Sequence, residues 1–204
     1  YDTIGIDCVA LCANDILRRG AMPLYFLDYL AVGKLEQYRI NKILKGVISG
    51  CMEANCSLIG GETAQLPEFY KEDEYELAGF CVGIVEKDKM ITGDNVRPGD
   101  LMVGFASSGL HSNGYTLARK VMLSRHNINE IAYDNTTLGK ALLEPSRIYV
   151  KPVSDILKNH FDDITGLVNI TGSAFNKLKK LNPKVGFRIN RLMQIPPIFR
   201  IIQE

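Results

Sequence analysis

One apolar stripe constrains the fold more than any other feature of the chain. Between Ile40 and Met52, apolar residues recur at positions i, i+3, i+4, i+7, i+8, i+11 and i+12. This spacing places them on one face of a helix, which we predict over residues 35–54, and it indicates that the whole face packs into a core. The apolar run at residues 23–32 is shorter, ends at Gly33 and predicts a buried strand. A long amphipathic helix beside a buried strand is typical of chains that combine helices with a sheet.

The other patterns complete a chain of mixed helices and strands. They predict helices at residues 7–19, 115–125, 138–143 and 173–181 and one after Pro152, strands at 57–59, 75–85, 101–106 and 166–170, and an extended segment at 185–189. The class is therefore α/β or α+β, a mixed sheet packed with helices. A polar segment with little periodicity ends near residue 137. We therefore divide the chain into a first domain, residues 1–137, and part of a second, residues 138–204.

Charge and hydropathy exclude several functional classes. The chain holds 24 Lys and Arg against 23 Asp and Glu, a formal net charge of +1, which excludes a strongly basic nucleic-acid-binding protein. No apolar stretch approaches the roughly 20 residues of a membrane-spanning helix, and the first residues do not resemble a secretory signal. We expect a cytoplasmic protein that contacts neither membrane nor nucleic acid. Because the chain begins with Tyr1 instead of Met, we also expect it to be a piece of a longer protein.

Five cysteines, an odd number, indicate reduced thiols in a chain large enough to form its own core. A zinc site from Cys8, Cys12, Cys51 and Cys56 is the alternative, but the spacing is looser than the usual two-residue knuckle. Buried cysteines commonly act as small apolar residues. Packing therefore explains them without a metal.

Two glycines followed by a carboxylate form the first candidate site. Gly60, Gly61 and Glu62 come where a short predicted strand ends. The amides of glycines can approach phosphate oxygens closely, and a carboxylate can bind Mg²⁺. The alternative is a tight turn with a solvent-exposed Glu62, and the segment taken alone favours that alternative.

A polar loop at residues 107–114 forms the second candidate site. Its hydroxyls and amides, together with the positive end of the helix predicted to follow it, can bind an anion. Ser112 or Asn113 could equally be a simple helix cap. His111 differs from a core histidine because small polar residues surround it, and we expect it to face solvent or a ligand.

Two further segments place polar groups on or before helices. Asp15 interrupts an otherwise apolar stretch of the first predicted helix, and such a carboxylate either has a partner, for example Mg²⁺, or faces water. Asp7, eight residues earlier, lies on a similar side of that helix and could join the same site. Residues 169–174 form a predicted strand-to-helix junction, where phosphate binding and simple capping both fit.

Taken together, these segments resemble the phosphoribosylformylglycinamidine cyclo-ligases, also called aminoimidazole ribonucleotide synthetases. The resemblance covers most of the chain and is carried by residues 2–10, 14–15, 20–23, 26–29, 33–35, 58–64, 77–80, 82–87, 107–115 and 147–152. Selenophosphate synthetase, thiamine-phosphate kinase, formylglycinamidine ribonucleotide synthetase and a hydrogenase maturation protein share parts of the pattern. The run from His111 to Tyr115, combined with that from Arg147 to Lys151, points to the cyclo-ligases among them.

The resemblance implies a two-domain α/β subunit that forms a homodimer, with residues 1–137 as the ATP-binding and dimerisation domain. It implies an enzyme of purine biosynthesis that uses ATP and Mg²⁺ to close the imidazole ring of formylglycinamidine ribonucleotide. Asp15 and Glu62 would hold Mg²⁺, with Asp7 as an additional candidate. His111 would act near the reacting amide, in an acid/base or an electrostatic role. The residues around the phosphate groups would be Gly60, Gly61, Ser108, Asn113, Thr171 and Gly172.

Three departures from the family pattern leave other functions open. The family has a glycine-rich stretch with a lysine and an Asp-Gly-Val-Gly motif in the region before Tyr1, and this chain contains neither. The second domain is expected to stop about halfway. Residues 169–174 read Asn-Ile-Thr-Gly-Ser-Ala where the family has His-Ile-Thr-Gly-Gly-Gly. The chain could therefore be a non-catalytic fragment or dimerisation module, or part of a related kinase with another acceptor such as thiamine phosphate.

Overall fold

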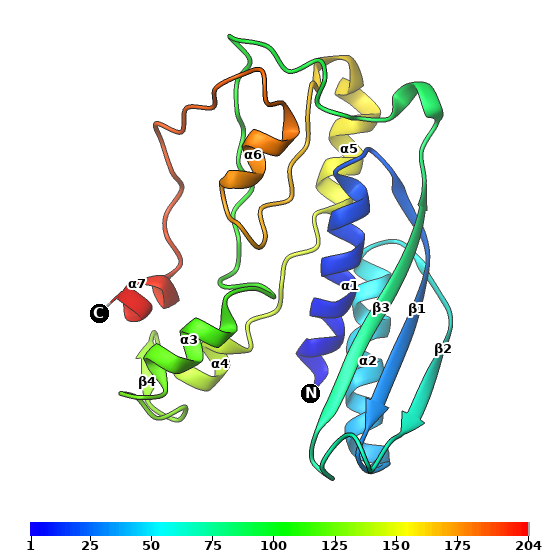
Figure 1. Cartoon of the computed structure of the whole chain (residues 1–204), viewed down its shortest axis with the longest axis vertical. Coiled ribbons are helices and arrows are strands. Elements are labelled where there is room, and N and C mark those ends of the chain that lie inside the picture. Colours follow the sequence, from blue (N-terminus) through cyan, green and yellow to red (C-terminus); the bar gives the residue numbers. More distant parts are fainter. Residues whose placement is uncertain (204) are drawn as a thin grey trace.

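The computed structural model describes residues 1–203, and its largest unit is a three-stranded sheet with two helices on one face (Figure 1). The unit contains α1 (Asp2–Leu17), β1 (Met22–Val32), α2 (Gln37–Glu53), β2 (Ser57–Gln65) and β3 (Tyr75–Ile84). The strand order is β2-β1-β3, with β1 parallel to β2 and antiparallel to β3. The predicted α/β class is confirmed, as are the predicted helix at 35–54 and the strands at 23–32 and 75–85, within two or three residues.

Glycines let α1 and α2 cross with their backbones in contact. A Cβ atom on Gly5 would lie 2.3 Å from the amide nitrogen of Val47, and one on Gly46 would lie 2.1 Å from the carbonyl oxygen of Asp2. Real Cβ atoms do not approach backbone so closely, so this crossing requires glycine at both positions. It also explains why α1 begins at Asp2, a full turn before the predicted start, because the first turn packs directly on α2.

The core between this helix pair and the sheet uses only part of the predicted apolar stripe. Ile43 and Val47 are fully buried and Cys51 is 3% exposed, but Ile48 is 48% and Met52 73% exposed. The prediction that the whole stripe packs into the core is therefore wrong. Ile48 instead lines an open cleft between α2 and β2.

The rest of the chain forms shorter elements around a second core. In chain order these are η1 (Lys87–Lys89), α3 (Tyr115–Met122), β4 (Ile131–Tyr133), β5 (Thr136–Thr137), α4 (Leu138–Leu142), α5 (Val150–His160), η2 (Phe161–Asp163), α6 (Asn176–Leu181) and α7 (Pro197–Gln203). The second core joins α3, α4 and α7 through Met122, Leu138 and Ile198, whereas Val150 and Val153 of α5 join the first core. The division at residues 137 and 138 stays a prediction, and α3 before it shares a core with α4 and α7 after it.

Two predicted strands are wrong, because residues 101–106 and 166–170 form no strand. A strand is stable only when its backbone groups pair with a neighbour, and within residues 1–203 no backbone hydrogen bond joins the segment 101–106 to another strand. Its apolar side chains are accordingly open to solvent, with Leu101 94% and Val103 83% exposed.

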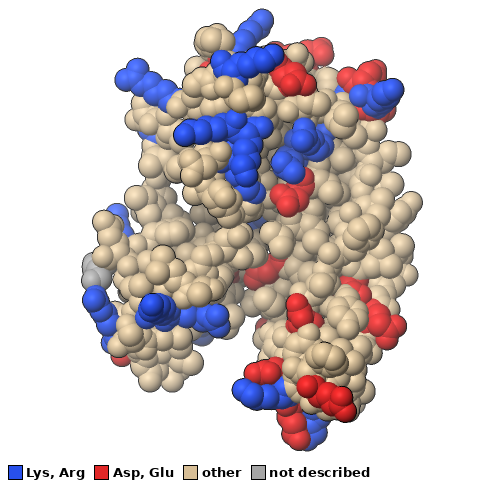
Figure 2. Space-filling model, viewed as in Figure 1, with Lys and Arg blue, Asp and Glu red and all other residues tan. Residues whose placement is uncertain are grey.

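The charged surface shows no single dominant sign on the face seen in Figure 2. Lys and Arg are spread over several elements and are interspersed with Asp and Glu. This distribution agrees with the formal net charge of +1. Within residues 1–203, every helix is too short or too polar to traverse a bilayer.

Candidate functional site

A polar hollow forms where α1, the loop at residues 107–114 and two later segments meet. Its volume is about 20 Å³, room for little more than one water molecule. Its wall consists of Ala10, Leu11, Asn14, His111, Ser112, Asn113, Ser146, Asn169 and Thr171. The fold thus collects polar residues from four separate stretches of chain, including three of the predicted site residues.

One face of α1 holds the chain at residues 146–149 against the hollow. Asp7 Oδ1 accepts hydrogen bonds from the amide of Ser146 at 2.8 Å and from its hydroxyl at 2.5 Å. Asn14, seven residues on and buried, donates to the carbonyl of Arg147 and accepts from the amide of Tyr149, both at 2.9 Å. No role for Asn14 was predicted from the sequence. Its spacing from Asp7 is the signal, because residues seven apart share a helix face.

His111 faces backbone amides. Its Nε2 accepts from the amide of Ser108 at 3.1 Å and from that of Arg147 at 3.4 Å, so the ring is neutral with its proton on Nδ1. Burial lowers the pKa of His111, Arg147 lowers it further, and Asp7 opposes both. The residue has a φ of 56°, and its ring centroid lies 6.3 Å from that of Tyr149. His111 therefore ties its own loop to the segment that α1 holds.

The junction at residues 169–174 completes this side of the site. Asp15 is exposed, and its Oδ1 accepts from the side-chain amide of Asn169 at 3.1 Å. A Cβ atom on Gly172 would lie 3.3 Å from Oδ1 of Asn113, so the two residues are neighbours. Thr171 lines the hollow, and its hydroxyl accepts a hydrogen bond from Lys177. Asn113, Thr171 and Gly172 thus lie together, although 58 or more residues separate Asn113 from the other two in sequence.

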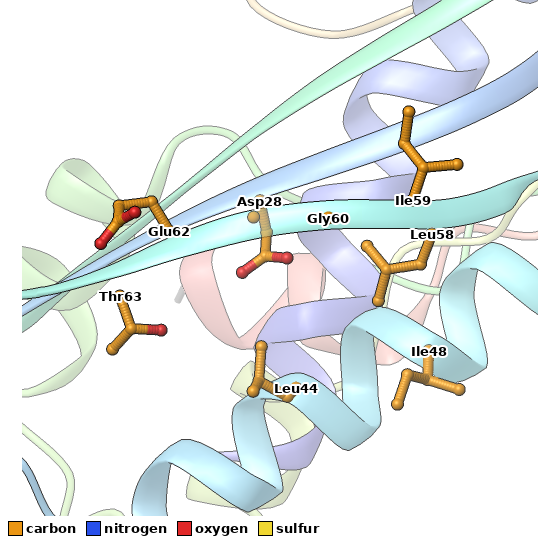
Figure 3. A pocket seen from close by; sticks show the side chains of 9 residues that line it. Asp28, Leu44, Ile48, Leu58, Ile59, Gly60, Glu62 and Thr63 are labelled. Carbon is orange, nitrogen blue, oxygen red and sulfur yellow. The ribbon is translucent and has the colours of Figure 1, made fainter.

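A separate cleft of about 440 Å³ lies between α2 and β2 (Figure 3). This volume is within the roughly 300–1,000 Å³ typical of ligand sites. Gly60, Gly61, Glu62 and Thr63 line it, and all four lie inside β2, which continues to Gln65. The prediction that they follow the end of a strand is therefore wrong. A glycine pair commonly indicates a turn, but here the pairing of β2 with β1 extends through both glycines.

Asp28, on β1, also lines this cleft, although it was not predicted as a site residue. It is 8% exposed, and burial raises the pKa of its carboxyl group. A Cβ atom on Gly61 would lie 2.4 Å from Asp28 Oδ1, whereas one on Gly60 would meet nothing within 4 Å. Gly61 thus leaves room for the carboxylate on the α2 side of β2, whereas a Cβ atom on Gly60 would project from the opposite face into open space. The available signal was an acidic residue on the inward face of a buried strand.

The carboxylates predicted to bind Mg²⁺ lie in different places. Glu62 lines the cleft, whereas Asp15 and Asp7 accept hydrogen bonds from Asn169 and Ser146. No residue lines both the cleft and the hollow. In Figure 3, Asp28 points toward α2, whereas Glu62 projects from β2 in another direction. Among residues 1–203, no three His, Cys, Asp or Glu side chains are arranged to hold a metal ion. The four cysteines of the zinc alternative do not form such a group within these residues.

In comparisons with known proteins, curated relatives that match this chain share one name. The chain is 51% identical to the phosphoribosylformylglycinamidine cyclo-ligase of Pseudothermotoga lettingae, across 100% of this chain and 61% of that protein. The enzyme of the same name from Caldicellulosiruptor bescii is also 51% identical, with the same coverage, and that from Bacillus cereus strain ZK is 48% identical over 100% of this chain and 60% of the relative. The chain therefore spans about three fifths of the length of these curated relatives.

Some solved structures share the fold, and two family models match the chain. Thiamine monophosphate kinase from Aquifex aeolicus matches with a TM-score of 0.55 at 18% identity, over 77% of this chain and 48% of its own. The hydrogenase maturation protein HypE matches with a TM-score of 0.51 at 20% identity, over 76% and 44%. At these identities the likeness shows the fold alone. The family model described as AIR synthase related protein, N-terminal domain, matches residues 1–85, and that of the C-terminal domain matches residues 97–203. The chain therefore belongs to the AIR synthase related protein family.

Proposed function

We propose that the complete protein catalyses the ATP-dependent cyclisation of formylglycinamidine ribonucleotide to 5-aminoimidazole ribonucleotide, a step of de novo purine biosynthesis. The observation that carries this proposal is the identity of 47–51% over the whole chain to relatives named phosphoribosylformylglycinamidine cyclo-ligase. The similarity spans the whole chain, so the compared segments include both the hollow and the cleft.

The proposed reaction has two chemical steps. ATP phosphorylates the formyl amide oxygen, and an amidine nitrogen then attacks the activated carbon while phosphate leaves with that oxygen. Phosphoryl transfer depends on positioning and charge neutralisation more than on covalent chemistry by the protein. ATP as the donor agrees with two proteins of the same fold, whose structures are described as a thiamine monophosphate kinase complexed with AMPPCP and TMP and as HypE in complex with ATP.

The hollow and the cleft support different parts of this proposal. Asn113, Thr171 and Gly172 would contact phosphate groups beside the hollow, and Ser108 would order the loop, since its hydroxyl donates to the carbonyl of Pro145 at 2.7 Å. The backbone of Gly60 and Gly61, which both line the cleft, would receive a phosphate there. We propose that the residues of the hollow and those of the cleft surround one substrate complex.

His111 would act near the reacting amide as a neutral hydrogen-bonding group. Its Nε2 already accepts from two amides, so a proton there would cost both hydrogen bonds. The lowered pKa of His111, caused first by burial, favours the same neutral form. An electrostatic or positioning role therefore fits this ring better than that of an imidazolium acid.

Mg²⁺ would accompany ATP. The residues of this chain do not enclose a metal site of three carboxylates, histidines or cysteines within residues 1–203. Mg²⁺ commonly keeps several waters and uses one or two carboxylates together with substrate phosphates, so single carboxylates such as Glu62 or Asp15 meet that requirement. When bound with ATP, the ion would neutralise charge on the phosphates.

A homodimer is supported by the uncovered face of the sheet. Side chains of β1 that alternate with buried Phe26 and Leu30 point away from α1 and α2. The exposed apolar members of this face are Tyr25, Tyr29, Ile59, Phe80 and Ile84. An apolar sheet face normally packs against another layer, and a second copy of the cytoplasmic protein would supply it. Phe80→Asp should then shift the complete protein from dimer to monomer in analytical ultracentrifugation.

An acceptor screen tests the proposed function. The complete protein is incubated with ATP, Mg²⁺ and either formylglycinamidine ribonucleotide or thiamine phosphate, and ADP is measured. Release of ADP only with the first acceptor supports the cyclo-ligase, and release only with the second would show a related kinase. Absence of ADP with both, together with saturable ATP binding in calorimetry, would show a non-catalytic nucleotide-binding module.

A further inference from the structure

The five cysteines gather in one layer, although they come from distant positions. Cys51 belongs to the core between the helices and the sheet, and Cys8, Cys12, Cys56 and Cys81 pack against that core. All five are free thiols. Cys51 is 3% exposed, whereas Cys56 and Cys81 are half-buried. The proposed ring closure uses none of these sulfur atoms.

The end of α2 brings Cys51 and Cys56 together. Asn55 follows the helix in the left-handed region, with a φ of 52°, and its amide donates to the carbonyl of Met52 at 3.3 Å. The amide of Cys56 donates to the carbonyl of Cys51 at 3.0 Å. These two hydrogen bonds define a Schellman motif, in which the side chains at the positions of Cys51 and Cys56 commonly touch. A disulfide needs Cα atoms roughly 4.4–6.8 Å apart, and a direct backbone hydrogen bond holds the two residues close to such a separation.

Cys56 is the thiol best prepared to react. Hydrogen bonds from the thiols of Cys51 and Cys81 lower the pKa of Cys56 to about 4, although burial opposes them. The same hydrogen bonds raise the pKa of Cys51 and of Cys81. Burial raises the pKa of Cys8 to about 12. Among these three thiols, the hydrogen bonds therefore favour the nucleophilic thiolate at Cys56, which is half-buried, over Cys51 and Cys81.

We propose that Cys56 is a site of reversible oxidation by hydroperoxides and that Cys51 closes the disulfide. The Cys56 thiolate attacks one oxygen of hydrogen peroxide and breaks the O–O bond, which leaves a sulfenic acid and, after protonation, one water. The sulfur of Cys51 then attacks the sulfur of Cys56, and the hydroxyl group leaves with the Cys51 proton as a second water. Two thiols lose two electrons, and one peroxide is reduced to two waters. A thiol reductant reverses the bond by exchange.

The disulfide would link the last turn of α2 to the residue before β2. That strand carries Gly60 and Gly61, only four and five residues beyond Cys56. Oxidation would thus restrain the start of the strand that forms one wall of the cleft.

Peptide mapping of the complete protein tests the proposal. The protein is treated with hydrogen peroxide, the remaining thiols are alkylated with N-ethylmaleimide, and trypsin is added without reduction. Residues 46–71 form one tryptic peptide that contains Cys51 and Cys56, and residues 72–87 form another that contains Cys81. We expect the first peptide to lose the mass of two hydrogens and to stay unalkylated. Cleavage after Glu53 should give two halves that separate only on reduction.

Other outcomes would overturn the proposal. Alkylation of both cysteines after peroxide treatment would show that Cys56 is not oxidised, and a link between the two tryptic peptides would replace Cys51 by Cys81. Cys56→Ser should abolish the disulfide, and Cys51→Ala should leave a sulfenic acid that dimedone traps. Cys12→Ser is the matched control and should leave the disulfide intact. In the untreated wild-type protein at pH 7, alkylation of Cys56 should be at least about tenfold faster than that of Cys8, and equal rates would contradict its reactivity.

Discussion

The two adjacent glycines of β2 provide a sharp test of the cleft, because their surroundings differ. A Cβ atom on Gly61 would lie 2.4 Å from Asp28 Oδ1 and 2.7 Å from the backbone oxygen of Asp28. β1 is the central strand, and the Asp28 side chain is 8% exposed, so neither atom can retreat easily. A Cβ atom on Gly60 would meet nothing within 4 Å. The same substitution at neighbouring positions should therefore have different effects.

The expected magnitudes follow from these distances. Gly61→Ala overpacks the sheet, which typically costs about 1–3 kcal/mol. Gly60→Ala removes a flexible residue from a strand without a clash, and alanine is favoured there by roughly 0.5–1 kcal/mol. In a domain of this size, 1 kcal/mol corresponds to a change of roughly 2–4 °C in melting temperature. Gly61→Ala should therefore melt several degrees below the wild type, and Gly60→Ala at or slightly above it.

Thermal unfolding and ATP titration of the complete protein measure the two effects separately. Gly61→Ala, whose methyl group would project on the Asp28 side of β2, should also lose ATP affinity. Gly60→Ala, whose methyl group would project from the opposite face, is the matched control and should keep its stability and its ATP affinity. Wild-type stability of Gly61→Ala would refute the packing of Gly61 against Asp28. Wild-type ATP affinity of Gly61→Ala would refute phosphate contact in the cleft.

Three further predictions concern His111 and the helix crossing. His111→Ala in the complete protein should lower turnover by about 100-fold or more with little change in ATP affinity, and unchanged steady-state kinetics would remove His111 from the reaction. Because burial lowers the folded pKa of His111 below its usual 6.5, the unfolded chain binds the proton more readily. The stability that His111 contributes is therefore present above about pH 6.5 and is lost as the pH falls through the lowered folded pKa. The free energy of unfolding in urea, measured between pH 7 and 5, should therefore depend less on pH in His111→Gln than in the wild type. An equal pH dependence in the two proteins would contradict the lowered pKa of His111. Gly46→Ala should lower the free energy of unfolding by about 1–3 kcal/mol, because its Cβ would lie 2.1 Å from the carbonyl oxygen of Asp2, whereas Gly186→Ala, with nothing within 4 Å, should match the wild type in the same urea titration.

The sequence predicted well those elements whose pattern is local and continuous. The helix at Gln37–Glu53 follows from its apolar periodicity, and the strand at Met22–Val32 follows from a short apolar run that ends at Gly33. The strand at residues 57–65 was predicted too short because glycines at 60 and 61 indicate a turn unless a neighbouring strand pairs with them. Residues 101–106 have the composition of a strand but pair with no neighbouring strand, and strand pairing depends on the tertiary structure.

The candidate site, too, could be predicted only in part, because it combines residues that are far apart in sequence. Sequence could nominate His111, Asn113 and Thr171 as polar residues near helices, but only the fold shows that they share one hollow. The carboxylates of Asp7 and Asp15 lie on one predicted helix, yet each has a different hydrogen-bond partner from a distant segment. Side-chain partners more than a hundred residues away cannot be read from local spacing.

Isotope labelling tests directly whether the complete protein phosphorylates the formyl oxygen of its proposed substrate and closes the imidazole ring. The complete protein is incubated with ATP, Mg²⁺ and formylglycinamidine ribonucleotide labelled with ¹⁸O at the formyl oxygen. We expect 5-aminoimidazole ribonucleotide together with inorganic phosphate that carries the label. Absence of the imidazole product, or release of unlabelled phosphate with it, would contradict the proposed function.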